Sequence, residues 1–311
     1  MTEYSHISVL REEAIAALQP VDGGIYLDGT FGGGGYSRAI LERSACRLYA
    51  IDRDPVAVVR SKELHAAYPG RFEIMAGRIS ELGEMLGARE VGALDGAVFD
   101  LGLSSYQIDD PSRGFSFRQD GPLDMRMGRE GPDAATIVNL CPESELADIL
   151  FRYGDEKAAR RVARVIVERR KVQKFATTAD LAGVIRSVVR PDKSGIDPAT
   201  RSFQALRIAV NDELTDIEAA LEQAAALLQP GGRLVVVSFH SLEDRIVKHF
   251  FAERAGRMPA ASRHDPAGLA PASVPMFRLV KKSPVLPGLA ETRANPRARS
   301  AKLRAIERLA A

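Results

Sequence analysis

The sequence predicts an α/β fold, in which a parallel sheet covered by helices is interrupted by an inserted all-helical domain. From residue 25 to 100, short apolar runs alternate with helix-like stretches, which is the pattern of a parallel sheet. Between 105 and 202 the only periodicity is helical, and beyond it the α/β pattern resumes. We therefore expect one discontinuous domain, 1–104 with 203–311, and a helical domain over 105–202.

The first α/β segment contains four runs that are apolar along most of their length. Strands buried on both faces by flanking helices have this composition, because neither face meets water. A helical pattern separates each run from the next. The predicted strands and helices, alternating in chain order, are 25–27, 37–43, 48–51, 55–64, 72–75, 80–86 and 96–99.

The chain changes character after Asp100. Residues 102–132 are rich in Gly, Pro, Asp and Arg, and helical spacing of apolar residues follows, with Thr177 and Pro191 as expected punctuation. The α/β pattern then returns, with a Pro-Gly-Gly turn at 230–232 before the most apolar run of the chain. The remaining predicted elements are helices at 143–152, 156–170, 178–189, 197–210 and 213–228, a strand at 234–239 and a long loop at 256–275.

The composition excludes several classes of protein. Lys and Arg total 43 against 41 Asp and Glu, so the whole chain lacks the basic excess expected where phosphate neutralisation dominates. No apolar run approaches the roughly 20 residues that cross a bilayer, and the N-terminus lacks an export signal, so we expect a cytoplasmic protein with no membrane partner. Two cysteines rule out a disulfide framework, and five histidines without ligand spacing predict no metal site.

A glycine-rich loop follows the first predicted strand. Residues 28–36 read Asp-Gly-Thr-Phe-Gly-Gly-Gly-Gly-Tyr, with five glycines in the place where an open α/β sheet binds ligands. An ordinary strand-to-helix turn needs only one or two glycines. Neither the three-glycine dinucleotide spacing nor a P-loop lysine is present, so we expect no pyrophosphate cradle.

Asp52 ends the second predicted strand, in the position where an acid commonly accepts hydrogen bonds from ribose hydroxyls. A strand-end Asp often only caps the following turn, so this residue alone is a weak signal. Together with the glycine loop it indicates an adenosine whose partner is not pyrophosphate. S-adenosylmethionine is the ligand that fits.

Two further residues end predicted strands at the same edge of the sheet. Asp100 stands where hydrogen-bond acceptors orient the lone pair of an exocyclic amine and stabilise its developing positive charge, although it also suits a simple turn cap. His240 follows the later strand, where a functional and a structural role are equally open. The same segment predicts a capping box with Ser241 at the N-cap and Asp244 three residues on.

Together these segments resemble the bacterial 16S ribosomal RNA (cytosine-N4)-methyltransferases. The resemblance spans nearly the whole chain, and several of the matching strings are long and rare. They are His6 with Val9-Leu10, 28–32, 50–55, 100–105, 113–117, 121–127, 204–211, 238–245 and 295–300. The resemblance implies a class I, Rossmann-like methyltransferase sheet with a helical insertion, and S-adenosylmethionine as cofactor. It implies methylation of N4 of one cytosine in the decoding centre of 16S rRNA, in the small ribosomal subunit.

The resemblance also assigns site residues by position. The cofactor contacts it implies are Gly34, Gly35, Tyr36, Asp52, Ile79, Asp100 and Gln107. For catalysis we expect Asp100 to orient the amine and His240 to assist in positioning or proton removal. The family usually has His in place of Tyr36 and Phe in place of Ile79. A backbone contact survives the first change, and an apolar wall against adenine persists after the second without aromatic stacking.

An RNA substrate has to be reconciled with the near-zero net charge. Residues 157–174 carry eight basic residues against one acid, and 278–311 carry nine against two. We expect both stretches to hold rRNA phosphates, although basic helices are often only solvated surface. We also expect a mobile lip over the target base, because extracted bases stack on aromatic rings and guanidinium groups. Its residues are Arg113, Phe115, Phe117 and Arg126.

Two other functions stay open on the sequence. A methyltransferase for a small molecule or a protein would share the cofactor edge, but the two basic stretches argue against it. A catalytically silent ribosome-assembly factor would bind RNA and cofactor as a sensor, and the presence of Asp100, Gln107 and His240 argues against that. The sequence does not indicate an oligomeric state, and a homodimer is left open.

Overall fold

The computed structural model describes residues 8–191, 195–257 and 275–310. It divides into two compact units, Met1–Gly102 with Leu214–Ala311 and Leu103–Glu213, which we call the α/β unit and the helical unit. His6 and most of the loop expected at 256–275 lie outside the described residues. None of the described helices is long and apolar enough to cross a membrane.

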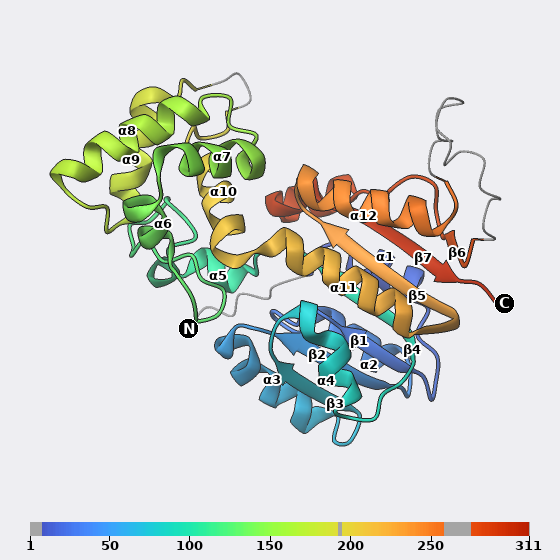
Figure 1. The fold of residues 1–311 in the computed structure, drawn as a ribbon. Helices are drawn as coiled ribbons and strands as arrows, with labels where there is room; N and C mark the ends of the chain where they lie inside the picture. Colours follow the sequence, from blue (N-terminus) through green and yellow to red (C-terminus); the bar gives the residue numbers. More distant parts are fainter. Residues whose placement is uncertain (1–7, 192–194, 258–274, 311) are drawn as a thin grey trace, which may run out of the picture. The chain divides into compact units, whose positions relative to one another are not determined.

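A seven-stranded sheet forms the centre of the α/β unit (Figure 1). Its strands are β1 (Ile25–Asp28), β2 (Arg47–Asp52), β3 (Phe72–Ala76), β4 (Leu94–Asp100), β5 (Leu228–Ser238), β6 (Phe277–Leu279) and β7 (Lys302–Arg308). Their order is β3-β2-β1-β4-β5-β7-β6, with β1 to β5 parallel and β7 antiparallel to both of its neighbours. The predicted fold class is confirmed, and the antiparallel pair β6 and β7 is an addition that the sequence did not predict.

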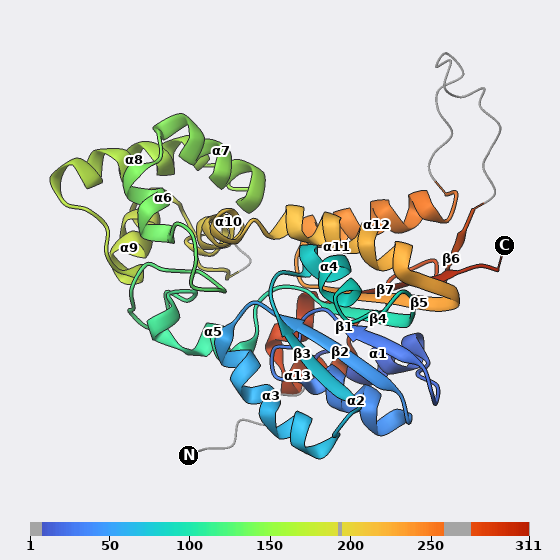
Figure 2. The ribbon, with the colours of Figure 1, turned by 60° about the horizontal axis from the view of Figure 1, so that its bottom comes forward.

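Helices cover both faces of this sheet (Figures 1 and 2). On one face lie α1 (Arg11–Leu18), α2 (Gly35–Arg43) and α3 (Pro55–Ala67), and on the other α4 (Leu82–Gly87), α11 (Glu213–Leu227) and α12 (Ser241–Arg254). The short helix α13 (Leu289–Ala294) and 3-10 turns at Ile79–Glu81 and Pro296–Ser300 complete the unit. Successive strand residues alternate between the two cores, Leu27 in one and Tyr26 in the other, so the strands are buried on both sides as their composition predicted.

Strand β5 contains the expected Pro-Gly-Gly turn as a bulge. Leu94 pairs with Leu228 and Gly96 with Arg233, so the intervening segment of β5 is longer than its partner on β4. Gly231 has a φ of 84°, a left-handed conformation that suits glycine at this irregularity. The turn and the strand that the sequence separated therefore belong to one bulged strand.

The helical unit has its own apolar core, separate from the two cores of the sheet. It contains α5 (Ser105–Asp109), a 3-10 turn at Pro111–Arg113, α6 (Ala134–Leu140), α7 (Glu143–Gly154), α8 (Ala159–Val172), α9 (Thr178–Val188) and α10 (Thr200–Asn211). Thr177, which the sequence marked as punctuation, caps α9: its hydroxyl accepts a hydrogen bond from the backbone N–H of Asp180 at 3.3 Å.

Helix α10 packs in the helical unit rather than against the sheet. Phe203 and Leu206 are buried in the helical core. The Asn211 side chain donates to the carbonyl of Met125 at 2.7 Å and accepts from the N–H of Met127 at 2.8 Å. The unit therefore ends at Glu213 and not at residue 202, where the sequence placed the boundary. An amphipathic pattern shows which face of a helix is buried but not which core receives it.

Candidate active site

The order of the sheet strands reverses between β1 and β4, so their carboxyl ends form the switch point at which α/β sheets bind ligands. Asp28 lies at this end of β1 and is fully buried. It accepts hydrogen bonds from the Ser37 hydroxyl at 2.7 Å and from the N–H of Thr30 at 3.1 Å. Burial raises the pKa of Asp28 to about 6, although these hydrogen bonds oppose the rise. Asp28 thus fastens the start of the glycine loop to helix α2.

The glycine loop is shaped both by backbone conformation and by close packing. Gly32 and Gly34 have φ values of 54° and 76°, which side chains rarely tolerate. A Cβ atom on Gly35 would lie 2.0 Å from the Ser8 hydroxyl oxygen, and one on Gly34 would lie 2.7 Å from the Phe31 ring. Packing inside the protein therefore accounts for part of the glycine content that the sequence attributed to a ligand.

Asp52 joins this loop to the end of β2. One carboxylate oxygen accepts from the N–H of Gly32 at 2.7 Å and the other from the N–H of Asp54 at 2.8 Å. Burial raises the pKa of Asp52 to about 6. Each carboxylate oxygen has further acceptor capacity, so Asp52 can hold the loop and still accept from a ribose hydroxyl.

Asp100, at the end of β4, carries a buried carboxylate oxygen that accepts no hydrogen bond from any described residue. Its backbone N–H donates to the Thr30 hydroxyl at 2.6 Å, which connects β4 to the glycine loop. Burial, followed by the charges of Asp28 and Glu243, raises the pKa of Asp100 well above its usual range. A buried acceptor without a donor costs free energy, and a ligand N–H group that reached it would remove that cost.

His240 caps helix α12, which corrects the predicted capping box. Its Nδ1 accepts from the backbone N–H of Glu243 at 3.4 Å, and the Glu243 carboxylate accepts from the N–H of His240 at 3.2 Å. Ser241 and Asp244 were expected in these roles. Asp244 instead pairs with a cation of strand β7, since its carboxylate accepts from Arg304 Nε at 2.7 Å.

The side chain of Tyr36 is turned into the core of the α/β unit. It is buried, and its hydroxyl donates to the backbone carbonyl of Val9. Burial raises the pKa of the phenol well above its usual range. Any cofactor contact at this position therefore comes from the backbone. Ile79 begins the 3-10 turn after β3 and packs, partly exposed, against the core on the α4 side.

Gln107 belongs to the helical unit, unlike the other predicted cofactor contacts, which belong to the α/β unit. It is buried and forms a capping box at the start of α5. Its side-chain oxygen accepts from the N–H of Ser104 at 3.1 Å, and its own N–H lies 3.3 Å from the Ser104 hydroxyl. The Ser-Ser-Tyr-Gln string carried this local signal, since Ser followed by Gln three residues later is a capping-box pattern.

The residues expected to form a mobile lip are packed inside the helical unit. Phe115 is buried, with the Arg113 guanidinium 5.7 Å from its ring centre. Phe117 packs edge-on against Phe203 at 4.8 Å, and the Arg186 guanidinium lies 5.3 Å from the same ring. These aromatic rings already have partners, so the structure does not support the expectation that they cover an extracted base.

One aspartate that pairs with two arginines near Asp52 was not predicted from the sequence. Asp216 of α11, which is buried, lies 3.4 Å from Arg53 after β2 and 3.0 Å from Arg78 after β3. One carboxylate thus connects the two loops that follow these strands. No sequence signal indicates it, because the partners are more than 130 residues apart along the chain.

Comparison with known proteins identifies the family to which this chain is similar. The family model described as the MraW methylase family matches residues 3–309. A protein of Acidiphilium cryptum named ribosomal RNA small subunit methyltransferase H is 66% identical over 99% of this chain and 98% of its own. Proteins of the same name from Granulibacter bethesdensis and Paramagnetospirillum magneticum are 57% and 55% identical, over 97% and 100% of this chain and 91% and 98% of their own.

Proposed function

Because this chain belongs to the MraW methylase family, we infer that it is a methyltransferase that uses S-adenosylmethionine to methylate N4 of a cytosine in 16S ribosomal RNA. Its relatives carry the name of a small-subunit rRNA methyltransferase over nearly their full lengths. The observation that supports the proposed chemistry is the buried oxygen of Asp100 at the switch point of the sheet, which has no hydrogen-bond partner in the described part of the chain. An amine nucleophile requires an acceptor at such a place.

The cofactor edge of the α/β unit suits an adenosine bearing a sulfonium. We assign the ribose hydroxyls to Asp52, whose oxygens retain acceptor capacity, and the adenine face to the apolar side chain of Ile79. Backbone groups at Gly34, Gly35 and Tyr36 line the loop that opens α2. We also retain Gln107 as a contact on the strength of the family resemblance alone. When bound, S-adenosylmethionine supplies an electrophilic methyl group.

Asp100 has the central role in the proposed mechanism. The lone pair of a cytosine N4 amine is conjugated with the ring, so the amine is a weak nucleophile until its hydrogens are held. An ionised Asp100 accepts a hydrogen bond from one N–H of the amine, which orients the lone pair of the nitrogen. Its negative charge offsets the positive charge that develops on that nitrogen. Its burial makes the interaction strong, because the site has a low local dielectric.

His240 acts in this proposal as a positioning residue. Its Nδ1 accepts from the α12 backbone, and its Nε2 lies 3.0 Å from the Glu243 carboxylate. Of the two roles expected for His240, this geometry favours positioning over proton removal, because both ring nitrogens face groups of its own helix cap. His240 and Glu243 together hold the start of α12 near Asp100. The charge of Glu243 helps to raise the pKa of Asp100.

The proposal includes the ribosomal subunit and the cell compartment in which methylation takes place. We place the substrate cytosine in the small ribosomal subunit and the enzyme in the cytoplasm, where that RNA is found. Asp100 and His240 are both present, which favours an active enzyme over a silent assembly factor. The homodimer left open by the sequence stays a prediction.

Mass-spectrometric mapping of 16S rRNA from cells with and without this protein tests the function. We expect one N4-methyl group to disappear from a single cytosine when the protein is absent, and to return with the wild-type chain. An unchanged map would refute the proposal. Incubation with tritiated S-adenosylmethionine and separate RNA, protein and metabolite fractions then identifies any other acceptor.

A further inference from the structure

The basic stretch 157–174 divides into a paired and an unpaired part. In its later part, Arg164 lies 3.7 Å from Glu143 and Arg169 lies 3.1 Å from Asp180. Arg170 donates to the Val138 carbonyl at 2.8 Å, and Lys171 pairs with Glu168 at 2.7 Å. In its earlier part, Lys157, Arg160 and Arg161 are exposed and have no ion-pair or hydrogen-bond partner among the described residues. Lys174, beyond the end of α8, is also exposed and without a partner among the described residues, so three of the four free cations of this stretch lie around the start of α8.

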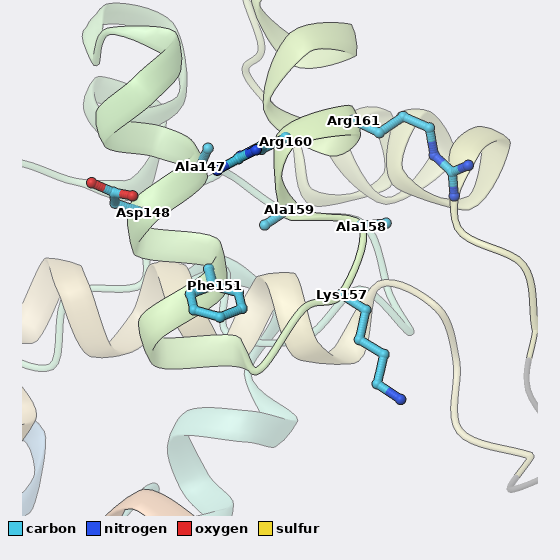
Figure 3. Close-up of a pocket in the computed structure, with 8 residues that line it drawn as sticks. All are labelled: Ala147, Asp148, Phe151, Lys157, Ala158, Ala159, Arg160 and Arg161. Carbon is cyan, nitrogen blue, oxygen red and sulfur yellow. The ribbon is translucent and has the colours of Figure 1, made fainter.

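These three cations border a groove of about 650 Å³ between α7 and the start of α8 (Figure 3). The small side chains of Ala147 and Ala159 leave room between the two helices. Phe151 lies on α7 beside this space, and Arg160 extends across it toward Ala147. Asp148 is the only acid among the lining residues, and it lies three residues before Phe151 on α7.

Phe151 is unusual among the aromatic residues of the chain. Its exposed fraction is 63%, and it is the only exposed phenylalanine of the twelve in the sequence. The buried face of α7 is formed by Leu146, Leu150 and their neighbours, so Phe151 contributes little to the helical core. An exposed ring next to a cluster of cations offers a flat apolar surface to a partner that is also anionic.

The position of the cations points to an anion as well. A helix N-terminus carries a partial positive charge, so basic side chains there are unfavourable, and α8 has no acidic residue in its first turn. The nearby carboxylate of Glu156 is buried and accepts from the N–H of Ala158 at 2.8 Å, so it is already engaged. A bound phosphate would interact favourably both with these basic side chains and with the positive end of α8.

We propose that the groove between α7 and α8 binds an unpaired nucleotide of the RNA substrate. The base stacks on Phe151, and its phosphates are held by Lys157 and Arg160. This inference rests on the proposed function, because it adds a second contact to the same RNA. A nucleotide combines the two features that the groove offers to a ligand, an aromatic face and an adjacent negative charge. A paired base would not fit, because its faces are covered by its neighbours in the duplex.

Binding of short RNAs to the full-length protein tests this assignment. The probes are a single-stranded RNA of mixed sequence and an RNA duplex of equal length, each measured at several salt concentrations. The variants are Phe151→Ala, Phe151→Tyr and Arg160→Gln. Arg190→Gln is the matched control, since Arg190 is an exposed arginine of the same unit that lies outside the groove and has no partner among the residues that the structure describes. Thermal melting confirms that each variant is folded.

We expect Phe151→Ala to weaken single-strand binding by about tenfold or more and to leave duplex binding unchanged, whereas Phe151→Tyr retains wild-type affinity. Arg160→Gln should reduce the salt slope by about one, and Arg190→Gln should not. Unchanged single-strand affinity in Phe151→Ala would overturn the proposal. So would an equal loss for the duplex, or displacement of the RNA by poly-glutamate as efficiently as by RNA, which would indicate an acidic protein.

Methyl transfer to 16S rRNA is measured separately on the same preparations. If the wild type methylates this RNA and Phe151→Ala binds single strands normally, the groove assignment fails while the function stands. If the wild type methylates no RNA, but Phe151→Ala still loses single-strand binding selectively, the function fails and the groove remains an RNA site.

Discussion

His240 and Glu243 cap helix α12 reciprocally. The imidazole Nδ1 accepts from the Glu243 backbone at 3.4 Å, and the Glu243 carboxylate accepts from the His240 backbone at 3.2 Å. The carboxylate is fully buried, and its other oxygen lies 3.0 Å from His240 Nε2. His240, which the sequence suggested as a possible catalytic residue, is thus the N-cap of α12.

This relationship predicts how His240 variants behave. Asparagine is a good N-cap and leaves no imidazole, whereas alanine cannot cap. We expect His240→Asn to retain most of the wild-type kcat, and His240→Ala to lower it by about tenfold and to lower the melting temperature. The pH profile should keep its shape in His240→Asn. Equal loss of kcat in both variants, with normal melting, would mean that the imidazole takes part in the chemistry.

Asp100 should make turnover depend on pH. Burial raises the pKa of Asp100, and only the ionised carboxylate offsets the positive charge that develops on the amine, so kcat should rise with pH until Asp100 is fully ionised. Asp100→Asn should reduce kcat by about a hundredfold or more and abolish this rise, by analogy with the removal of other charge-stabilising groups. Binding of S-adenosylmethionine, measured by calorimetry, reports whether the cofactor edge is intact. Near-normal turnover in a variant that binds cofactor would refute the role.

Asp28 should make the free protein less stable as the pH rises. Its pKa rises from an ordinary 3.8 to about 6 on folding, so its stabilising contribution is complete below about 4 and is lost as the pH passes through 6. A rise of this size corresponds to about 3 kcal/mol as an upper limit. Melting curves of Asp28→Asn and wild type between pH 5 and 7.5 measure it. We expect the variant to gain stability relative to wild type at the higher pH, and a constant difference would contradict this.

Asp216 should affect cofactor affinity without touching the reacting atoms. Its carboxylate joins Arg53 and Arg78, which lie on the loops after β2 and β3. We expect Asp216→Ala to raise the KM for S-adenosylmethionine by about tenfold with little change in kcat. The matched control is Glu63→Ala, because the Arg38–Glu63 pair is largely exposed and worth little. Similar KM values in both variants would show that the connection is dispensable.

Local patterns were sufficient for a large part of the structure. The first four strands, the start of a helix at Thr177 and the strand ends at Asp28 and Asp100 were all visible in short stretches of sequence. Each depends on neighbouring residues, such as an apolar run, a capping side chain or glycines after a strand. The boundary of the helical unit was misplaced because α10 shows one buried face and no sign of the core that buries it.

Residue order and composition were enough to predict the fold class and to fix the total charge of the basic stretches, whereas the position of the cofactor stays a prediction. Which of these charges remain available depends on how the chain folds. Arg169 is neutralised by Asp180 and Arg304 by Asp244, whereas Arg160 has no partner among the described residues. Charge is a property of each residue, but pairing depends on distance between side chains, and folding brings together residues that lie far apart in the chain.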